Sequence, residues 1–183
     1  FPILWSTGEL TTSIVVSTDG DYYYGGLDAN GCIVLSDTAT ITFTPAPTVN
    51  PTASPDTICA GSTSVLDANA TGTALTYVWN TGDTTATITV SAAGTYDVTV
   101  SNGFCPATGS ISVYQYSAPN VSLGNDQQVC PGTVVALTPS GGPYVTYNWS
   151  DGTTNATDSV SAPGDYWVTV NDGNCTYVSD TFT

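Results

Sequence analysis

Residues 77–105 read YVWNTGDTTATITVSAAGTYDVTVSNGFC. The same plan returns at residues 147–175 as YNWSDGTTNATDSVSAPGDYWVTVNDGNC, and in a more divergent form at residues 3–32 as ILWSTGELTTSIVVSTDGDYYYGGLDANGC. Similarity at a fixed period is the signature of a repeat protein. The chain of 183 residues therefore predicts three copies of one unit rather than a single large domain.

Apolar residues in each copy alternate with Thr and Ser at a period of two, which indicates strands with one buried face. In the central copy the expected inward positions are Ala86, Ile88, Val90, Tyr96, Val98 and Val100. In the last copy they are Leu137, Tyr147, Trp149, Val160, Tyr166, Val168 and Val170. Short strands separated by turn residues, without a helical period, are typical of an antiparallel β-sandwich. The predicted fold class is all-β.

Two Ala-Pro joints divide the chain, APTV at residues 46–49 and APNV at residues 118–121. We expect the second half of a repeat at 1–47, a complete repeat at 48–119 and another at 120–183. A sandwich cannot bury its inner face when half of its strands are absent. Residues 1–47 should therefore be completed by upstream residues or by a strand from a neighbouring subunit.

The chain has no Lys, Arg or His, and its formal net charge is −15. Binding to nucleic acid and to anionic lipid both need cationic side chains, so neither is expected. Without His there is no Ser-His-Asp triad and no usual zinc site. No apolar run is long enough for direct membrane insertion. We expect no enzymatic activity.

The five cysteines recur at matching points of the repeats. Cys59 precedes Cys105 by 46 residues, and Cys130 precedes Cys175 by 45. We interpret each pair as a disulfide within its repeat, stabilising the fold by roughly 4 kcal/mol. Cys32 should then have its partner outside the chain. Free buried thiols or a zinc site are the alternatives, but the even spacing disfavours the first and the lack of close pairs the second. Disulfides imply an oxidising, extracytoplasmic setting.

The motif Y-x-W, followed by a Gly turn, an alternating strand, G-x-Y-x-V-T-V and a closing Cys, resembles immunoglobulin-like and PKD-like repeats. The segments WSTGELTTSIVV (residues 5–16) and DANGC (residues 28–32) resemble the repeats of SprB-like surface adhesins from gliding Bacteroidetes. This resemblance implies tandem β-sandwiches that are exported and form filaments or stalks on the cell surface.

Four carboxylates in turns, Asp19, Asp21, Asp151 and Asp165, are weak candidates for calcium ligands. Asp also favours such turns for local hydrogen bonding, which is the simpler explanation. No other cofactor is expected.

Four aromatic side chains, those of Trp167, Tyr23, Tyr114 and Tyr116, should point out of the sandwiches. They could stack on a glycan or on a neighbouring subunit, or pack at the joints between repeats.

Asp followed by Ser or Thr resembles the O-glycosylation signal of this bacterial group, which gives the candidates Thr38, Thr57, Thr84 and Ser159. The preceding residue of the last candidate, Asp158, occupies the place of Ile88. We expect Asp158 to be exposed or on a bulge, because burying an unpaired carboxylate is costly.

The predicted function is a structural segment of a secreted cell-surface filament or adhesin stalk, of the adhesion or gliding-motility type. Its partners would be other repeats of the chain, filament subunits and surface glycans. One alternative is a set of carbohydrate-binding repeats attached to a secreted hydrolase. Another is a filament subunit that assembles by strand exchange through residues 1–47.

Overall fold

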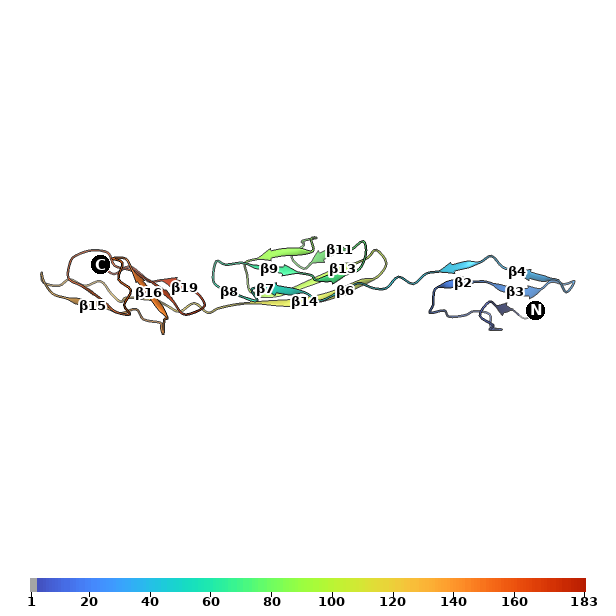
Figure 1. Cartoon of the computed structure of the whole chain (residues 1–183), viewed down its shortest axis with the longest axis horizontal. Helices are drawn as coiled ribbons and strands as arrows, with labels where there is room; N and C mark the ends of the chain where they lie inside the picture. The colour runs from blue at the N-terminus through green and yellow to red at the C-terminus, as the bar shows by residue number, and fades with distance from the viewer. Residues whose placement is uncertain (1–2) are drawn as a thin grey trace.

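The computed structural model describes residues 3–183, which form strands joined by turns and loops. Figure 1 shows three bodies in a row along one long axis. We call residues 3–47, 48–119 and 120–183 the first, second and third modules. Every strand pairing joins two strands of the same module. The molecule is therefore an all-β rod whose modules meet only end to end.

The second module is a two-sheet sandwich. One sheet has the order β12 (Thr87–Val90), β9 (Ser64–Asp67), β7 (Thr52–Ser54). The other has the order β11 (Thr76–Trp79), β13 (Gly94–Ser101), β14 (Pro106–Gln115), β8 (Thr57–Ile58), and its last pairing is parallel. The short strands β6 (Thr48–Val49) and β10 (Ala70–Thr71) pair beside them. These sheets have the strand order of an immunoglobulin-like sandwich, with E, B, A in one sheet and C, F, G in the other.

The core of the second module lies between its two sheets. Five of the six predicted inward residues are buried, and Leu66, Trp79 and Ile58 pack with them. Ala86 is exposed, contrary to the prediction. It precedes the first residue of β12, and its carbonyl accepts the N–H of Ala68 at the strand end.

A tight turn follows the Trp of each module. The indole N–H donates to the carbonyl six residues later, from Trp5 to Thr11 at 2.9 Å, from Trp79 to Thr85 at 2.9 Å and from Trp149 to Asn155 at 2.8 Å. The Gly three residues after each Trp has a φ of +96°, +92° or +93° and donates its N–H to the Trp carbonyl. Only glycine adopts this left-handed conformation without strain, which explains the W-x-x-G motif.

A tyrosine corner also recurs in every module. The hydroxyl of Tyr96 donates to the carbonyl of Ala92 at 2.8 Å. The equivalent bonds join Tyr22 to Thr18 at 2.7 Å and Tyr166 to Ala162 at 3.0 Å. Such a bond, from a Tyr near the start of strand F to backbone a few residues upstream, is a hallmark of immunoglobulin-like sandwiches.

The third module repeats this plan. Strand β15 (Val135–Leu137) pairs with β17 (Asp158–Val160), and β16 (Thr146–Trp149) pairs with β18 (Val168–Asn171), which pairs with β19 (Thr176–Val178). The predicted core is confirmed for the side chains that are buried, namely Leu137, Trp149, Val160, Val168 and Val170. Tyr147 and Tyr166 are partly buried against it.

Asp158 corrects one expectation. Its side chain is buried, with 6% exposed, and it pairs with Leu137 in a regular ladder without a bulge. The prediction that it faces solvent was wrong, because the period of two that buries Val160 also turns Asp158 inward. One carboxylate oxygen accepts the N–H of Ser159 at 2.8 Å, and the other has no hydrogen-bond partner among the described residues.

The first module has one side of the sandwich. Strand β1 (Leu4–Trp5) pairs with β3 (Tyr24–Leu27), which pairs with β4 (Ile33–Leu35). Strand β2 (Gly20–Tyr22) pairs with β5 (Ala39–Ile41). Gly25 and Gly26 lie inside β3 and pair with Leu35 and Val34, and Tyr23 alone separates β2 from β3.

Residues 12–17, TSIVVS, carry the same alternating pattern as residues 86–91, ATITVS, but they do not form a strand. Its equivalents, β12 and β17, pair with β9 and β15. The first module contains no such partner strand within the described residues, so the alternating pattern of residues 12–17 has nothing to pair with. Val15 is accordingly 99% exposed.

The tyrosine corner can be tested with Tyr96→Phe, which removes only the hydroxyl. We expect the unfolding free energy of the second module to fall by about 1 kcal/mol, the usual net contribution of one hydrogen bond. Hydrogen exchange of the β13 amides at increasing denaturant concentration measures the unfolding free energy of this module separately. The control is Tyr114→Phe, because the Tyr114 side chain is 62% exposed. Equal stability of the two variants would contradict the assigned role.

Candidate functional site at the joint between modules

A disulfide joins Cys59 of the second module to Cys175 of the third, across 116 residues of sequence. The Cα atoms are 5.7 Å apart, within the usual range for a disulfide. The predicted pairs Cys59–Cys105 and Cys130–Cys175 were therefore wrong. The bond links neighbouring modules instead of closing each one.

Strand direction explains why the predicted pair in the second module cannot form. Cys59 directly follows β8, whose Ile58 pairs with Gln115 at the far end of β14. Cys105 directly precedes the first residue of that same strand, which has 10 residues. At about 3.3 Å per residue the two cysteines lie roughly 33 Å apart, whereas a disulfide needs Cα atoms within about 7 Å.

The third module has the same geometry. The N–H of Gln127, close to Cys130, donates to the carbonyl of Thr183 at 3.2 Å. Thr183 is eight residues beyond Cys175, past β19 and the bridge between Phe182 and Tyr166. The two cysteines of the second module recur in the third, so a bond within a module and a bond to the next module both join equivalent positions and differ by one repeat period, 46 residues for Cys59–Cys105 and 116 for Cys59–Cys175. No sequence signal distinguished the two registers.

The turn between β18 and β19 holds Cys175 in place. One carboxylate oxygen of Asp172 accepts the N–H groups of Asn174 and Cys175, both at 2.8 Å. These backbone hydrogen bonds lower the pKa of Asp172 below its usual range. The Cys175 side chain is 2% exposed. The turn thus presents its cysteine in a fixed position at the end of the third module that faces the second.

The joint between the first and second modules uses the equivalent turn without a disulfide. The thiol of Cys105 donates to the carbonyl of Thr44 at 3.5 Å, and the Asn102 amide donates to the carbonyl of Pro45 at 2.8 Å. Cys32, Cys105 and Cys130 are unbonded within the described residues. At this joint the turn contacts the linker.

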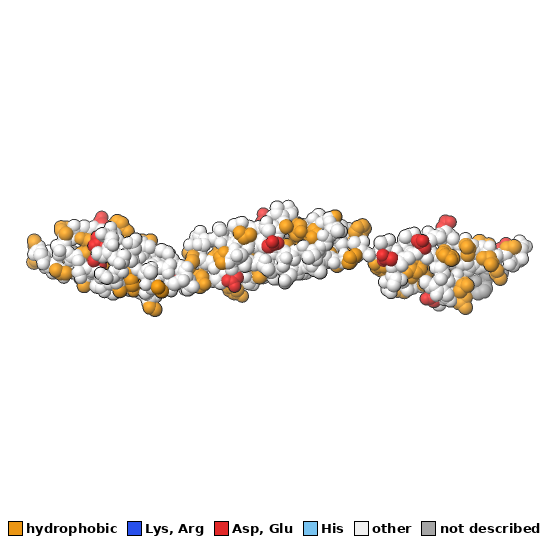
Figure 2. Space-filling model, viewed as in Figure 1, with side chains coloured by type: hydrophobic (Ala, Val, Ile, Leu, Met, Phe, Trp, Pro, Cys, Tyr) orange, Lys and Arg blue, Asp and Glu red, His pale blue; other side chains and the backbone are white. Residues whose placement is uncertain are grey.

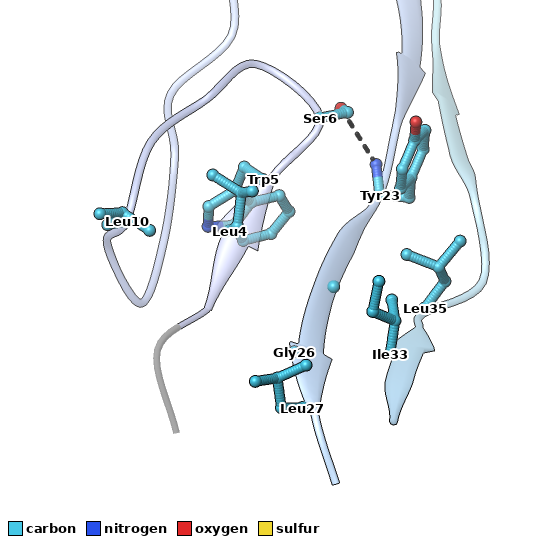
Figure 3. Close-up of a pocket in the computed structure, with 10 residues that line it drawn as sticks. Leu4, Trp5, Ser6, Leu10, Tyr23, Gly26, Leu27, Ile33 and Leu35 are labelled. Atoms are coloured by element: carbon cyan, nitrogen blue, oxygen red, sulfur yellow. Dashed lines mark hydrogen bonds between the residues drawn. The ribbon is translucent and has the colours of Figure 1, made fainter. Parts of the chain in front are cut away.

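The first module has an open apolar face. Figure 3 shows Leu4, Trp5 and Leu10 on one side of a hollow of about 550 Å³, with Leu27, Ile33 and Leu35 across from them. Trp5 is only half-buried, whereas its equivalents Trp79 and Trp149 are 1% and 3% exposed. In the second module this face is covered by the sheet of β7, β9 and β12.

The candidate calcium ligands lie apart, two in the first module and two in the third. Each accepts a hydrogen bond from its own module: Asp19 from the N–H of Phe43, Asp21 from the hydroxyl of Thr40, Asp151 from the N–H of Thr153, and Asp165 from the hydroxyl of Thr183. Among residues 3–183 no three Asp, Glu, His or Cys side chains gather into a metal-binding group. The Asp151 bond is a turn contact of the expected kind, whereas the bonds of Asp19, Asp21 and Asp165 join segments that are distant in the sequence.

The candidate contact aromatics are all exposed and are spread over the three modules. Their exposed fractions are 40% for Tyr23, 62% for Tyr114, 37% for Tyr116 and 43% for Trp167. The structure does not bring them together into one surface. Among the candidate glycosylation residues, Thr38, Thr84 and Ser159 are exposed and Thr57 is half-buried in β8.

Acidic side chains are distributed along all three modules on the face shown in Figure 2. The sequence has no Lys or Arg to balance them. The part of the chain that the structure describes has no helix long and apolar enough to cross a bilayer.

Comparison with known proteins gave only distant structural likenesses. No protein-family profile and no curated protein sequence matches the chain. Among solved structures, titin domains Z1Z2 in complex with telethonin align with 77% of this chain and 96% of theirs, at 18% identity and a TM-score of 0.34. Amphioxus IgVJ-C2 aligns with 52% of this chain at 20% identity and a TM-score of 0.32. The four N-terminal Ig domains of Dscam1 isoform 4.44 align with 100% of this chain at 15% identity and a TM-score of 0.30.

The chain spans 60% of the amphioxus structure and 64% of the Dscam1 structure. The immunoglobulin-like assignment rests on the strand order, the buried Trp and the tyrosine corner of the modules themselves.

The third module should lose stability in acid. Asp180 accepts the hydroxyl of Ser122 at 2.5 Å and the N–H of Leu123 at 2.7 Å, and these bonds lower its pKa. A lowered folded-state pKa contributes stability that is present above the unfolded value of about 3.9 and is lost as pH falls through the folded value. We expect the denaturation midpoint of this module to fall as the pH drops below about 4, and Asp180→Asn to flatten that dependence.

The matched control is Asp37→Asn in the first module, which should leave the pH profile of the third module unchanged. An unaltered profile in Asp180→Asn would contradict the assigned role of this carboxylate.

Proposed function

We propose that this chain is a load-bearing, non-catalytic segment of an extracellular filament or adhesin stalk. The observation that supports this most strongly is the covalent bond between successive modules, from Cys59 to Cys175. A disulfide at this position fixes how two modules meet and leaves each sandwich core untouched. It also implies assembly in an oxidising environment.

The disulfide changes the path that a pulling force takes. In the sequence Cys59 comes 11 residues after the second module begins and Cys175 comes 8 residues before the third ends, although the two lie together at the joint between the modules. Force applied along the rod crosses from one to the other through the sulfur bridge. The residues between them, one fewer than the separation of 116, lie inside a closed loop and carry no load. Most of both sandwiches is therefore protected from mechanical unfolding.

The rod shape and the charge support the same role. The three modules lie in line, so the length of the molecule grows with each module (Figure 1). A net charge of −15 without cations makes neighbouring rods repel one another at low salt. Both properties suit a spacer that extends away from a surface, with other modules of the same kind as its partners along the axis.

Single-molecule stretching from the two ends tests this function. With the disulfide intact, residues 60–174 should contribute no unfolding length. After reduction they should add up to about 400 Å, at about 3.4 Å per residue. Cys59→Ser should behave like the reduced protein, and Cys130→Ser should behave like the oxidised protein. Equal extension before and after reduction would exclude a load-bearing role for the bridge.

A further inference from the structure

We propose that Cys130 and Cys32 are two unbonded halves of the same kind of inter-module disulfide, and that they join successive copies of this chain head to tail. The inference rests on the proposed structural function. It extends that function by assigning a covalent docking role to each of these two exposed turns, with a second copy of residues 1–183 as the partner.

Cys32 is presented in the same way as the bonded Cys175. The N–H of Cys175 donates to the Asp172 carboxylate at 2.8 Å, and that of Cys32 donates to the Asp28 carboxylate at 2.9 Å. Cys105 has the same bond to the Asn102 side chain at 2.9 Å. Each of these cysteines ends the turn that leads into the last strands of its module. We call this arrangement the incoming turn.

Cys130 is presented in the same way as the bonded Cys59. The carbonyl of Cys59 accepts the N–H of Ser62 at 3.0 Å, and that of Cys130 accepts the N–H of Thr133 at 3.1 Å. The residues Gly61 and Gly132 have φ values of +80° and +86° in these turns. Both turns lie at the C-terminal end of their module. We call this arrangement the outgoing turn.

The solvent exposure of each unbonded cysteine decides which of them can form a disulfide between two copies. Cys32 and Cys130 are exposed, whereas Cys105 is half-buried beside the linker carbonyl of Thr44. The turn between β3 and β4 and the loop before β15 lie at opposite ends of the rod (Figure 1). A bond between Cys130 of one copy and Cys32 of the next thus continues the line of the modules.

The outgoing end also has apolar surface to cover. Cys130 lines a hollow of about 740 Å³ together with Val129, Val135 and Tyr166. Val129 occupies the place of Ile58 and is 50% exposed, while Ile58 is 1% exposed. An incoming turn docked at this end would lie beside that surface, as the turn that holds Cys175 lies beside Cys59.

The chemistry is thiol–disulfide exchange with a low-molecular-weight disulfide, such as oxidised glutathione, as the oxidant. The Cys130 sulfur, after losing its proton, attacks the oxidant, which releases one glutathione thiol and leaves a mixed disulfide. The deprotonated Cys32 sulfur of the next copy then displaces the second glutathione thiol. The two cysteines lose two protons and two electrons, and one glutathione disulfide becomes two thiols.

The test oxidises the chain of residues 1–183 with glutathione disulfide in high salt, which screens repulsion between acidic copies. Cleavage before Asp puts each cysteine on its own peptide, with Cys32 on residues 28–36 and Cys130 on residues 126–150. We expect a ladder on non-reducing gels whose main cross-linked peptide joins these two. Cys130→Ser and Cys32→Ser should each stop the ladder at the monomer, and Cys105→Ser should leave it unchanged.

A monomer under these conditions, or a statistical mixture of Cys32–Cys32, Cys130–Cys130 and Cys32–Cys130 bonds, would overturn the proposal. Either result leaves the proposed function separately testable, because stretching of a single copy depends only on the Cys59–Cys175 bond.

Discussion

The covalent bond between Cys59 and Cys175 is the constraint on which the rest of this account depends. It spans a joint whose linker is only a few residues long and fixes the orientation of two sandwiches. In the chain-entropy description, closing a loop of this size stabilises the folded state by about 5 kcal/mol. Because the loop encloses parts of two modules, this stabilisation couples their unfolding.

Each module is assembled from the same few local interactions. The indole hydrogen bond, the Gly turn after the Trp and the tyrosine corner recur at equivalent positions in all three. The Trp and Gly contacts lie where strand C ends, and the tyrosine corner lies near the start of strand F. They are present even in the first module, where the described residues include only one side of the sandwich. Local turn chemistry is therefore independent of core completion, whereas burial of the Trp is not.

The sequence predicted the strands and the core wherever a partner strand is present. Alternation of Val, Ile and Thr identified the inward residues of β12, β13, β17 and β18. It failed at residues 12–17, because a strand pattern requires a neighbouring strand that these residues lack. At Asp158 the alternation holds and the side chain is buried, whereas the expectation from the cost of burying a carboxylate was wrong. The register of the whole strand thus determines the direction of a single side chain.

The disulfide register could not be predicted for a different reason. In a repeat protein, a bond within one module and a bond to the next module join equivalent cysteines. Their sequence separations differ by one repeat period, so both fit the repeated spacing. Only the three-dimensional positions of the turns separate the two cases: the outgoing and incoming turns lie at opposite ends of one module and meet between modules. The staggered pairing is therefore a property of strand direction and length.

The most direct test of the central claim is a disulfide map of the unreduced monomer after cleavage before Asp. The account predicts that residues 56–66, which carry Cys59, are linked to residues 172–179, which carry Cys175. A link from residues 56–66 to residues 97–125, or from residues 126–150 to residues 172–179, would contradict it.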